Sequence, residues 1–241
     1  MPRFFIEDIE GDRLTITGDD ARHIGRSLRM RPGEELTVCD TRGIDCLCVV
    51  ESVSDTDVLV KVVERRSSDT EPTVKVTLYQ GYPKGDKLET IIEKSVELGV
   101  SRIVPVLTER SVARPDEKSA ARKLERWQRR ALEAAKQCGR GCIPQVEPMV
   151  SFPAVPAMMS RHDRALFCYE LGGQPLAQAL GQQPGEVGIF IGPEGGISAA
   201  EAEALEAAGA LPVTLGKRIL RTETAPLAAI TAVMLLTGNM E

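Results

Sequence analysis

The stretch Ile191-Gly192-Pro193-Glu194-Gly195-Gly196-Ile197-Ser198 decides the fold, because it joins a hydrophobic strand to a helix. Residues 187–191 are typical of a buried strand. The helix expected over 199–208 begins after Ser198, with Glu201 at capping-box spacing. The loop between them matches neither the dinucleotide-binding nor the phosphate-binding glycine pattern. It predicts either a plain tight turn or a site where backbone amides approach a ligand at the carboxyl end of a strand.

A second loop, over 215–226, also joins a short strand to a very apolar helix, expected over 226–236. It carries three cations and one carboxylate, Glu223, and Thr224 is placed to cap the helix. The cations can be solvated, and Glu223 can simply favour the helix N-terminus. Two such loops at the carboxyl ends of strands nevertheless favour a ligand site over two unrelated turns.

Strands and helices alternate from residue 74 onward, which predicts a mainly parallel sheet covered by helices. The expected strands are 74–79, 103–107, 165–169, 187–191 and 213–215. The expected helices are 86–98, 116–137, 199–208 and 226–236.

The first 70 residues are rich in short strands, which predicts a small β-barrel. A hairpin is expected from 3–9 and 13–17, and further strands are expected over 36–39, 46–53 and 58–63. Cys46 and Cys48 should share one buried face as small hydrophobic residues. One helix should begin near Asp19 and end before Pro32. Residues 65–72 are polar and unpatterned, and they are the best candidate for a linker.

Composition narrows the classes of protein. The 241 residues are 42% apolar and carry a net charge of −5, which argues against disorder, a membrane span and a generally basic surface. The N-terminus has no apolar signal core, so we expect a cytoplasmic protein. Six cysteines without a Cys-x-x-Cys pair should be reduced thiols, and no metal is expected. His23 and His162 should be ordinary surface residues.

Basic residues are nevertheless concentrated in two places. One is a predicted helix face, here called the arginine stripe, that consists of Arg22, Arg26 and Arg29. Apolar residues that should fix this helix lie opposite, at Ala21, Ile24 and Leu28. The other is the segment 110–140, with ten Lys and Arg against four Asp and Glu. Each is either a solvated helix face or a surface that neutralises RNA phosphates.

The motifs along the chain resemble those of one family. They lie at 84–89, 94, 97–100, 108–111, 126–127, 133–140, 191–196 and 215–225. In order and spacing they are similar to those of the bacterial 16S ribosomal RNA uridine-N3 methyltransferases of the SPOUT class. The resemblance implies an α/β chain with a PUA-like β-barrel, an RNA-binding domain, over 1–70. It implies a SPOUT methyltransferase domain with a deep trefoil knot over 71–241.

The same resemblance implies a cofactor, partners and site residues. S-adenosylmethionine would bind in the knot, and the partners would be 16S ribosomal RNA in the small subunit and a second copy of the chain, with the last helix at the dimer contact. The cofactor-binding residues would be Ile191, Gly192, Pro193, Glu194, Gly195, Gly196, Leu215, Gly216, Arg218, Ile219, Leu220 and Thr224. RNA would be bound by Arg22, Arg26, Arg29, Lys84 and Arg110.

Two residues are candidates for the chemistry. Uracil N3 is a poor nucleophile until it loses its proton, so a base or a group that stabilises an anion is needed. Glu223 is the candidate for base or orienter, and Arg221 for stabilising charge on the uracil oxygens. Two alternatives stay open. One is a SPOUT enzyme that methylates a ribose 2′-oxygen or another base, and the other is a non-catalytic RNA-binding assembly factor.

Overall fold

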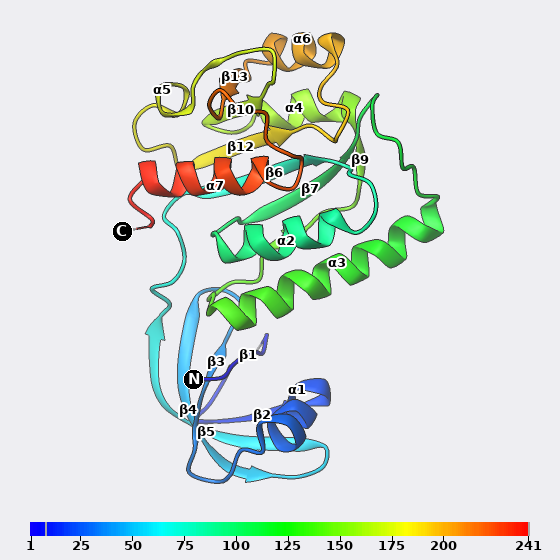
Figure 1. Ribbon diagram of the computed structural model, residues 1–241. Helices are drawn as coiled ribbons and strands as arrows, with labels where there is room; N and C mark the ends of the chain where they lie inside the picture. Colours follow the sequence, from blue (N-terminus) through cyan, green and yellow to red (C-terminus); the bar gives the residue numbers. More distant parts are fainter. Residues whose placement is uncertain (8, 241) are drawn as a thin grey trace. The chain divides into compact units, whose positions relative to one another are not determined.

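The computed structural model describes residues 1–7 and 9–240, and it divides into two compact units (Figure 1). The first comprises residues 1–71 and 135–143, and the second comprises 72–134 and 144–241. The sequence assigned 135–143 to the second domain, whereas these residues pack with the first unit. Each unit is described by itself.

A parallel sheet forms the centre of the second unit. Its strands are β6 (Lys75–Gly81), β7 (Arg102–Leu107), β8 (Gln145–Val146), β9 (Val150–Ser151), β10 (Arg164–Cys168), β11 (Gln174–Pro175), β12 (Glu186–Ile191) and β13 (Leu211–Thr214). Their order is β11-β13-β10-β12-β6-β7-β8, and β9 also pairs with β7. The pairs in this sheet are all parallel, which confirms the predicted arrangement. The two-residue strands β8, β9 and β11 were not predicted.

Helices cover both faces of this sheet. They are α2 (Lys87–Glu97), α3 (Glu117–Cys138), α4 (Val155–Met159), α5 (Leu176–Leu180), α6 (Ala199–Ala207) and α7 (Ala225–Leu236), with a 3-10 turn over Phe152–Ala154. Figure 1 shows α2 and α7 together on one face, and α4 packs with α6 on the other. Among the described residues, no helix is both long and apolar enough to cross a membrane.

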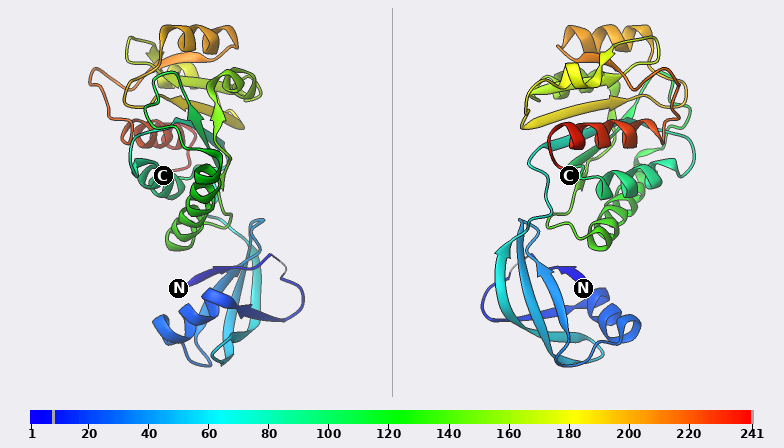
Figure 2. Two further views of the ribbon diagram at one scale, coloured as in Figure 1. Left: turned by 90° about the vertical axis from the view of Figure 1, so that its right-hand side faces the viewer. Right: turned by 60° about the vertical axis from the view of Figure 1, so that its left-hand side comes forward.

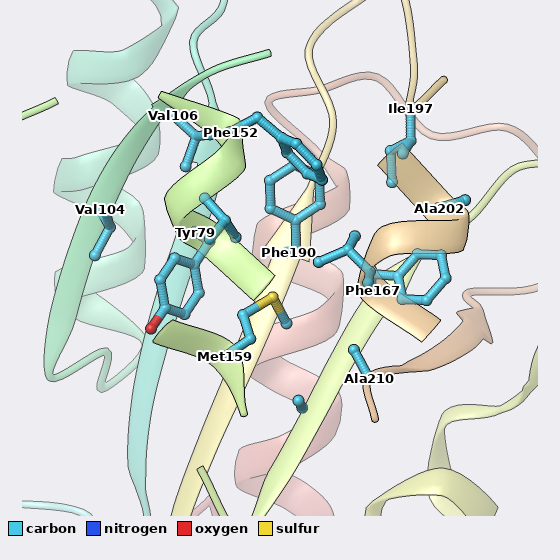
Figure 3. Packing of buried hydrophobic residues seen from close by; sticks show 13 residues of the cluster. Tyr79, Val104, Val106, Phe152, Met159, Phe167, Phe190, Ile197, Ala202 and Ala210 are labelled. Carbon is cyan, nitrogen blue, oxygen red and sulfur yellow. The ribbon is translucent and has the colours of Figure 1, made fainter. Parts of the chain in front are cut away.

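The core between the sheet and α4 and α6 is rich in aromatic side chains (Figure 3). Phe152 and Phe190 meet edge to face, with ring centroids 5.7 Å apart. The helix α6 starts as predicted, because the Ser198 side chain accepts a hydrogen bond from the Glu201 amide and the Glu201 carboxylate accepts one from Ser198 N–H. This core fixes β12 and α6, and with them the loop that joins the two.

A curled five-stranded sheet forms the first unit (Figure 2). Its strands are β1 (Arg3–Phe5), β2 (Arg13–Thr17), β3 (Glu35–Cys39), β4 (Ile44–Val53) and β5 (Asp57–Ser67), in the order β1-β3-β4-β5-β2. The predicted hairpin is wrong, since β1 pairs with β3 and β2 pairs with β5. The second pairing sets the buried Leu14 and Ile16 opposite Val60 and Val58, where they close the core. Burial of Cys46 and Cys48 in this core is confirmed.

The helix of the first unit begins as α1 (Gly18–Arg22) and continues as a π-helix over His23–Leu28. It ends at Arg29, which has a left-handed backbone with φ of 53°. Ala21 and Ile24 are buried as predicted, but Leu28 is 40% exposed. The wider π-helical turn changes the spacing, so that Leu28 no longer follows the buried face. The prediction that Leu28 anchors the helix is therefore wrong.

The segment 65–72 is not a free linker. Its first three residues belong to β5. The Glu71 carboxylate accepts hydrogen bonds from the buried Arg140 guanidinium at 2.6 and 2.9 Å and from the amides of Gly141 and Cys142. Because the Arg140 guanidinium is buried, loss of its carboxylate partner would leave an uncompensated charge, so this contact is costly to break. The polarity that suggested a linker reflects this contact.

A second buried ion pair lies nearby in the first unit. Arg3 donates hydrogen bonds to both carboxylate oxygens of Asp45, each at 2.8 Å, and to the carbonyl of Arg140 at 3.1 Å. The Asp45 side chain is 2% exposed. This pair ties β1 to β4 and to the loop that follows α3.

Candidate functional site

A cavity of about 650 Å³ lies at the carboxyl ends of β10, β12 and β13. These three strands are neighbours in a parallel sheet, so the loops that follow them meet at one edge. The loops span 169–173, 192–198 and 215–224. The cavity is lined by Lys87, Ala225, Cys168, Tyr169, Glu170, Gly172, Val213, Thr214, and residues 191–196 and 215–223.

The structure brings the two glycine-containing loops of the sequence together around this cavity. With one exception, the predicted cofactor-binding residues line it, and so do the predicted catalytic residues Arg221 and Glu223. The exception is Thr224, which is not part of the lining. Its side chain also makes no capping hydrogen bond, because its backbone is already helical, so the predicted cap is wrong.

The third loop, over 169–173, was missed by sequence reasoning. Its strand was predicted, but the loop lacks a dense glycine pattern and carries only Gly172 and Gly173. The signal that could have found it is topological, because it follows a third strand of the same parallel sheet.

Close packing explains one glycine of the cavity lining and one that packs behind it. Gly196 has a φ of 71°, and a Cβ there would overlap the Glu170 carboxylate. Gly81, at the end of β6, was not among the predicted residues, and a Cβ there would lie 2.5 Å from Pro193 Cδ. Gly195, by contrast, does not have a left-handed backbone, and its nearest neighbour would be Arg110 Cβ at 3.0 Å. The path of the loop therefore depends on glycine at 81 and 196.

A buried polar chain joins two of the loops. Gln80 Nε2 donates to Thr222 Oγ1 at 3.1 Å, and the Thr222 hydroxyl donates to the Gly192 carbonyl at 2.9 Å. Gln80 is fully buried and Thr222 is 6% exposed. Buried hydrogen bonds of this kind are costly to break. We call this chain the Gln80–Thr222 latch.

A lysine and two carboxylates meet at the edge of the cavity. Lys87 Nζ lies 2.9 Å from Glu194 Oε1 and 3.3 Å from Glu223 Oε2. Burial would raise the pKa of Glu194, but hydrogen bonds from Lys87 and from backbone amides lower it overall. The pKa of Glu223 is lowered by its own backbone amide, against a smaller effect of burial, and further by Lys87 and Arg221. Both side chains are therefore carboxylates at neutral pH.

The loop after β7 contacts the loop at 192–198 and the helix α6 that follows it. Arg110 Nη1 donates to the Gly195 carbonyl at 2.9 Å, and the Glu109 amide donates to the Glu201 carboxylate at 2.8 Å. The guanidinium that the sequence assigned to RNA thus contacts the 192–198 loop. The Lys84 side chain is exposed, and its backbone N–H approaches the Glu194 carboxylate at 3.3 Å.

The first unit presents the arginine stripe to solvent, since its three arginines are exposed. Arg22 is paired with Asp19. A polar hollow of about 350 Å³ lies beside the stripe. It is lined by Ala21, Arg22, Gly25, Arg26, Val53, Ser54 and Asp55.

Neither histidine belongs to the cavity. His23 is exposed as predicted, whereas His162 is half-buried, so its prediction as a surface residue is wrong. Burial lowers the pKa of His162, whose Nε2 lies 2.9 Å from Tyr79 Oη. Within residues 1–7 and 9–240, no group of three potential metal ligands is found.

Comparison with known proteins places both units in one class. A family model described as RNA methyltransferase domain matches residues 70–234, and one described as RNA methyltransferase PUA domain matches residues 16–63. The fold and the cavity therefore define an RNA methyltransferase with a PUA-like N-terminal unit. The sequence-based expectation of a SPOUT-class α/β fold is confirmed, and the trefoil knot stays a prediction.

Relatives that match over nearly their whole length identify the particular family within this class. Ribosomal RNA small subunit methyltransferase E of Bacillus subtilis is 37% identical, covering 97% of this chain and 96% of the relative. The enzyme of the same name from Neisseria gonorrhoeae, solved bound to S-adenosyl methionine, is 33% identical with a TM-score of 0.89, covering 98% of each chain. A putative methyltransferase from Legionella pneumophila, solved with the same cofactor, is 30% identical with a TM-score of 0.86, covering 97% of this chain and 96% of that chain. The chain belongs to the family of ribosomal RNA small subunit methyltransferase E.

Proposed function

We propose that this chain transfers the methyl group of S-adenosylmethionine to N3 of a uridine in 16S ribosomal RNA of the assembled small subunit. The observation that carries the proposal is the cavity at the ends of β10, β12 and β13, to which both predicted glycine-containing loops contribute. The solved relatives bound to S-adenosylmethionine support the choice of cofactor.

The residues of the cavity fit that cofactor. A volume of about 650 Å³ suits a small organic ligand. The loops offer backbone N–H and C=O groups, and their glycines at 192, 195, 196 and 216 add no side chains to the lining. Residues 191–196 and 215–220 would hold the molecule, and Ile191 and Leu220 add apolar surface to the lining. When bound, S-adenosylmethionine supplies an activated sulfonium methyl group.

Two side chains of the lining would act on the uracil ring. Arg221 would stabilise the negative charge that develops on the uracil oxygens when N3 loses its proton. Glu223 has a lowered pKa, which makes it a weak base but a good hydrogen-bond acceptor at neutral pH. Of its two predicted roles, orienting the ring therefore suits Glu223 better than removing the proton. Neither role needs a metal.

The proposed partners follow from charge and exposed apolar area. The arginine stripe and Lys84 would contact RNA phosphates, while the net charge of −5 favours the assembled particle over naked RNA. We place the enzyme in the cytoplasm with its substrate.

A homodimer is proposed through α7, which exposes about half of Leu235 and of Leu236. Light scattering should give twice the chain mass, and a monomer would contradict the dimer.

Two measurements test the proposed function. Calorimetric titration with S-adenosylmethionine should show saturable binding, and labelled methyl groups should then pass into small ribosomal subunits but not into large ones. Absence of binding would favour the RNA-binding assembly factor. Binding without transfer into small subunits would contradict the assignment of substrate.

A further inference from the structure

Lys87, at the edge of the cavity, has not yet been given a role in the proposed reaction. It is the first residue of α2 and contributes to the lining of the cavity. Its ammonium group contacts Glu194, from the loop after β12, and Glu223, from the loop before α7. One cation therefore joins three segments that are far apart in the sequence.

Lys87 is the cation that the two carboxylates share. Both oxygens lie within 3.3 Å of the same nitrogen atom, so the carboxylates are close enough to repel each other in its absence. Each carboxylate also accepts from its own backbone amide, the Lys84 amide approaches Glu194, and the charge of Arg221 acts on Glu223. None of these groups contacts both carboxylates.

We propose that Lys87 is a positioning residue of the methyl-transfer site, and that its ammonium group joins Glu194 to Glu223 and holds the Glu223 carboxylate at the edge of the cavity. This inference rests on the proposed function and assigns a role within the same site. Lys87 acts through Glu223, so its loss should affect the rate of methyl transfer more than the binding of the cofactor.

Two substitutions of Lys87 separate charge from shape. Lys87→Met keeps most of the length of the side chain but removes the cation, and misplacement of Glu223 should lower kcat about 10- to 100-fold. Lys87→Arg keeps the charge and should recover most of the rate. The calorimetric affinity for S-adenosylmethionine should change less than about threefold in both variants, since the loops at 191–196 and 215–220 are intact.

A pH profile distinguishes this role from a merely structural one. With Lys87 present, Glu223 is ionised across about pH 5.5–8, and this carboxylate contributes no pH dependence to kcat. In Lys87→Met, repulsion by Glu194 raises the pKa of Glu223. The acid limb of the pH profile, where kcat falls as Glu223 takes up a proton, should therefore move upward by about one pH unit. Removing that repulsion in the double variant Lys87→Met with Glu194→Gln should restore part of the rate and reverse the displacement.

Lys94→Met is the matched control. Lys94 lies on the same helix and also pairs with two glutamates, Glu93 and Glu97, but it is not part of the cavity lining. It should retain the wild-type kcat and pH profile.

The outcomes separate the two proposals. A wild-type chain that transfers no methyl group refutes the proposed function itself. A wild-type chain that methylates normally, with Lys87→Met matching Lys94→Met in kcat and pH profile, refutes the role of Lys87 alone. Circular dichroism verifies folding, and if Lys87→Met fails to fold, Lys87→Arg and the double variant decide. Equal loss of rate in these two folded variants, without a displaced acid limb, also overturns the inference.

Discussion

Replacing Thr222 by Val tests whether the Gln80–Thr222 latch holds the cavity together. Valine has nearly the same shape as threonine but removes two hydrogen bonds, one from Gln80 at 3.1 Å and one to the Gly192 carbonyl at 2.9 Å. A net contribution of about 0.5–1.5 kcal/mol for each bond gives a loss of about 2 kcal/mol. Gln80 Nε2 keeps its bond to the Gly81 carbonyl, which limits the cost.

Unfolding of the second unit can be followed by intrinsic fluorescence, because the only tryptophan of the chain, Trp127, is buried there. For a unit of this size, about 2 kcal/mol corresponds to a Tm lower by about 4–8 °C. The affinity for S-adenosylmethionine should also fall, since the Gln80–Thr222 latch fixes the Gly192 carbonyl in the loop that lines the cavity. Thr222→Ser keeps the hydroxyl and should lose much less of both. Equal Tm and affinity for the valine variant and the wild type would refute the latch, as would equal losses in both variants.

Four further predictions concern the loop at 192–198, the chemistry, the Arg3–Asp45 ion pair and the arginine stripe. Gly196→Ala should weaken S-adenosylmethionine binding at least about tenfold in calorimetry, because its φ of 71° and the nearby Glu170 oppose a side chain. Arg221→Ala and Glu223→Ala should each lower kcat about 10²- to 10³-fold with near-normal cofactor affinity, as expected of groups that act mainly in the transition state. Burial opposes ionisation of Asp45, but its arginine partner lowers the pKa overall, so its stabilisation is present above about pH 4 and lost in more acidic solution. Asp45→Asn should cost about 3–5 kcal/mol at pH 7, measured by urea unfolding and circular dichroism. Glutamate at all three positions of the arginine stripe should weaken binding to small subunits and flatten its salt dependence, while cofactor binding is retained. An unchanged salt dependence would contradict the proposal that the arginine stripe contacts RNA phosphates.

Much of the second unit could be predicted because its elements are long and locally encoded. Alternating apolar strands and amphipathic helices fix a parallel sheet, and the capping box at Ser198 marks the start of α6 within one residue. Short strands such as β8 and β11 carry only two residues each, too few for a periodic pattern.

The errors lie where pairing or geometry is not local. The sequence of residues 3–17 suits a hairpin, but Leu14 and Ile16 are buried only when β2 pairs with β5, more than 40 residues away. A π-helical turn exposes Leu28, and no residue pattern announces such a turn. The polarity of Glu71 resembles that of a linker because its partner, Arg140, is distant in the sequence.

In the candidate site, too, the features encoded locally were predicted and those that depend on distant segments were not. Glycine and charge patterns predicted the loops at 191–196 and 215–223, which line one cavity. Lys87 and Glu170 lie on other segments, and only the order of strands and the packing of α2 bring them to that cavity.

The most direct test of the central claim is the identity of the methylated nucleoside. Small ribosomal subunits that lack the modification are incubated with the chain and S-adenosylmethionine, and their ribosomal RNA is then digested to nucleosides and separated by mass spectrometry. The proposed function predicts a single new product, 3-methyluridine, that depends on Arg221. A 2′-O-methylated nucleoside or a methyl group on another base would contradict it.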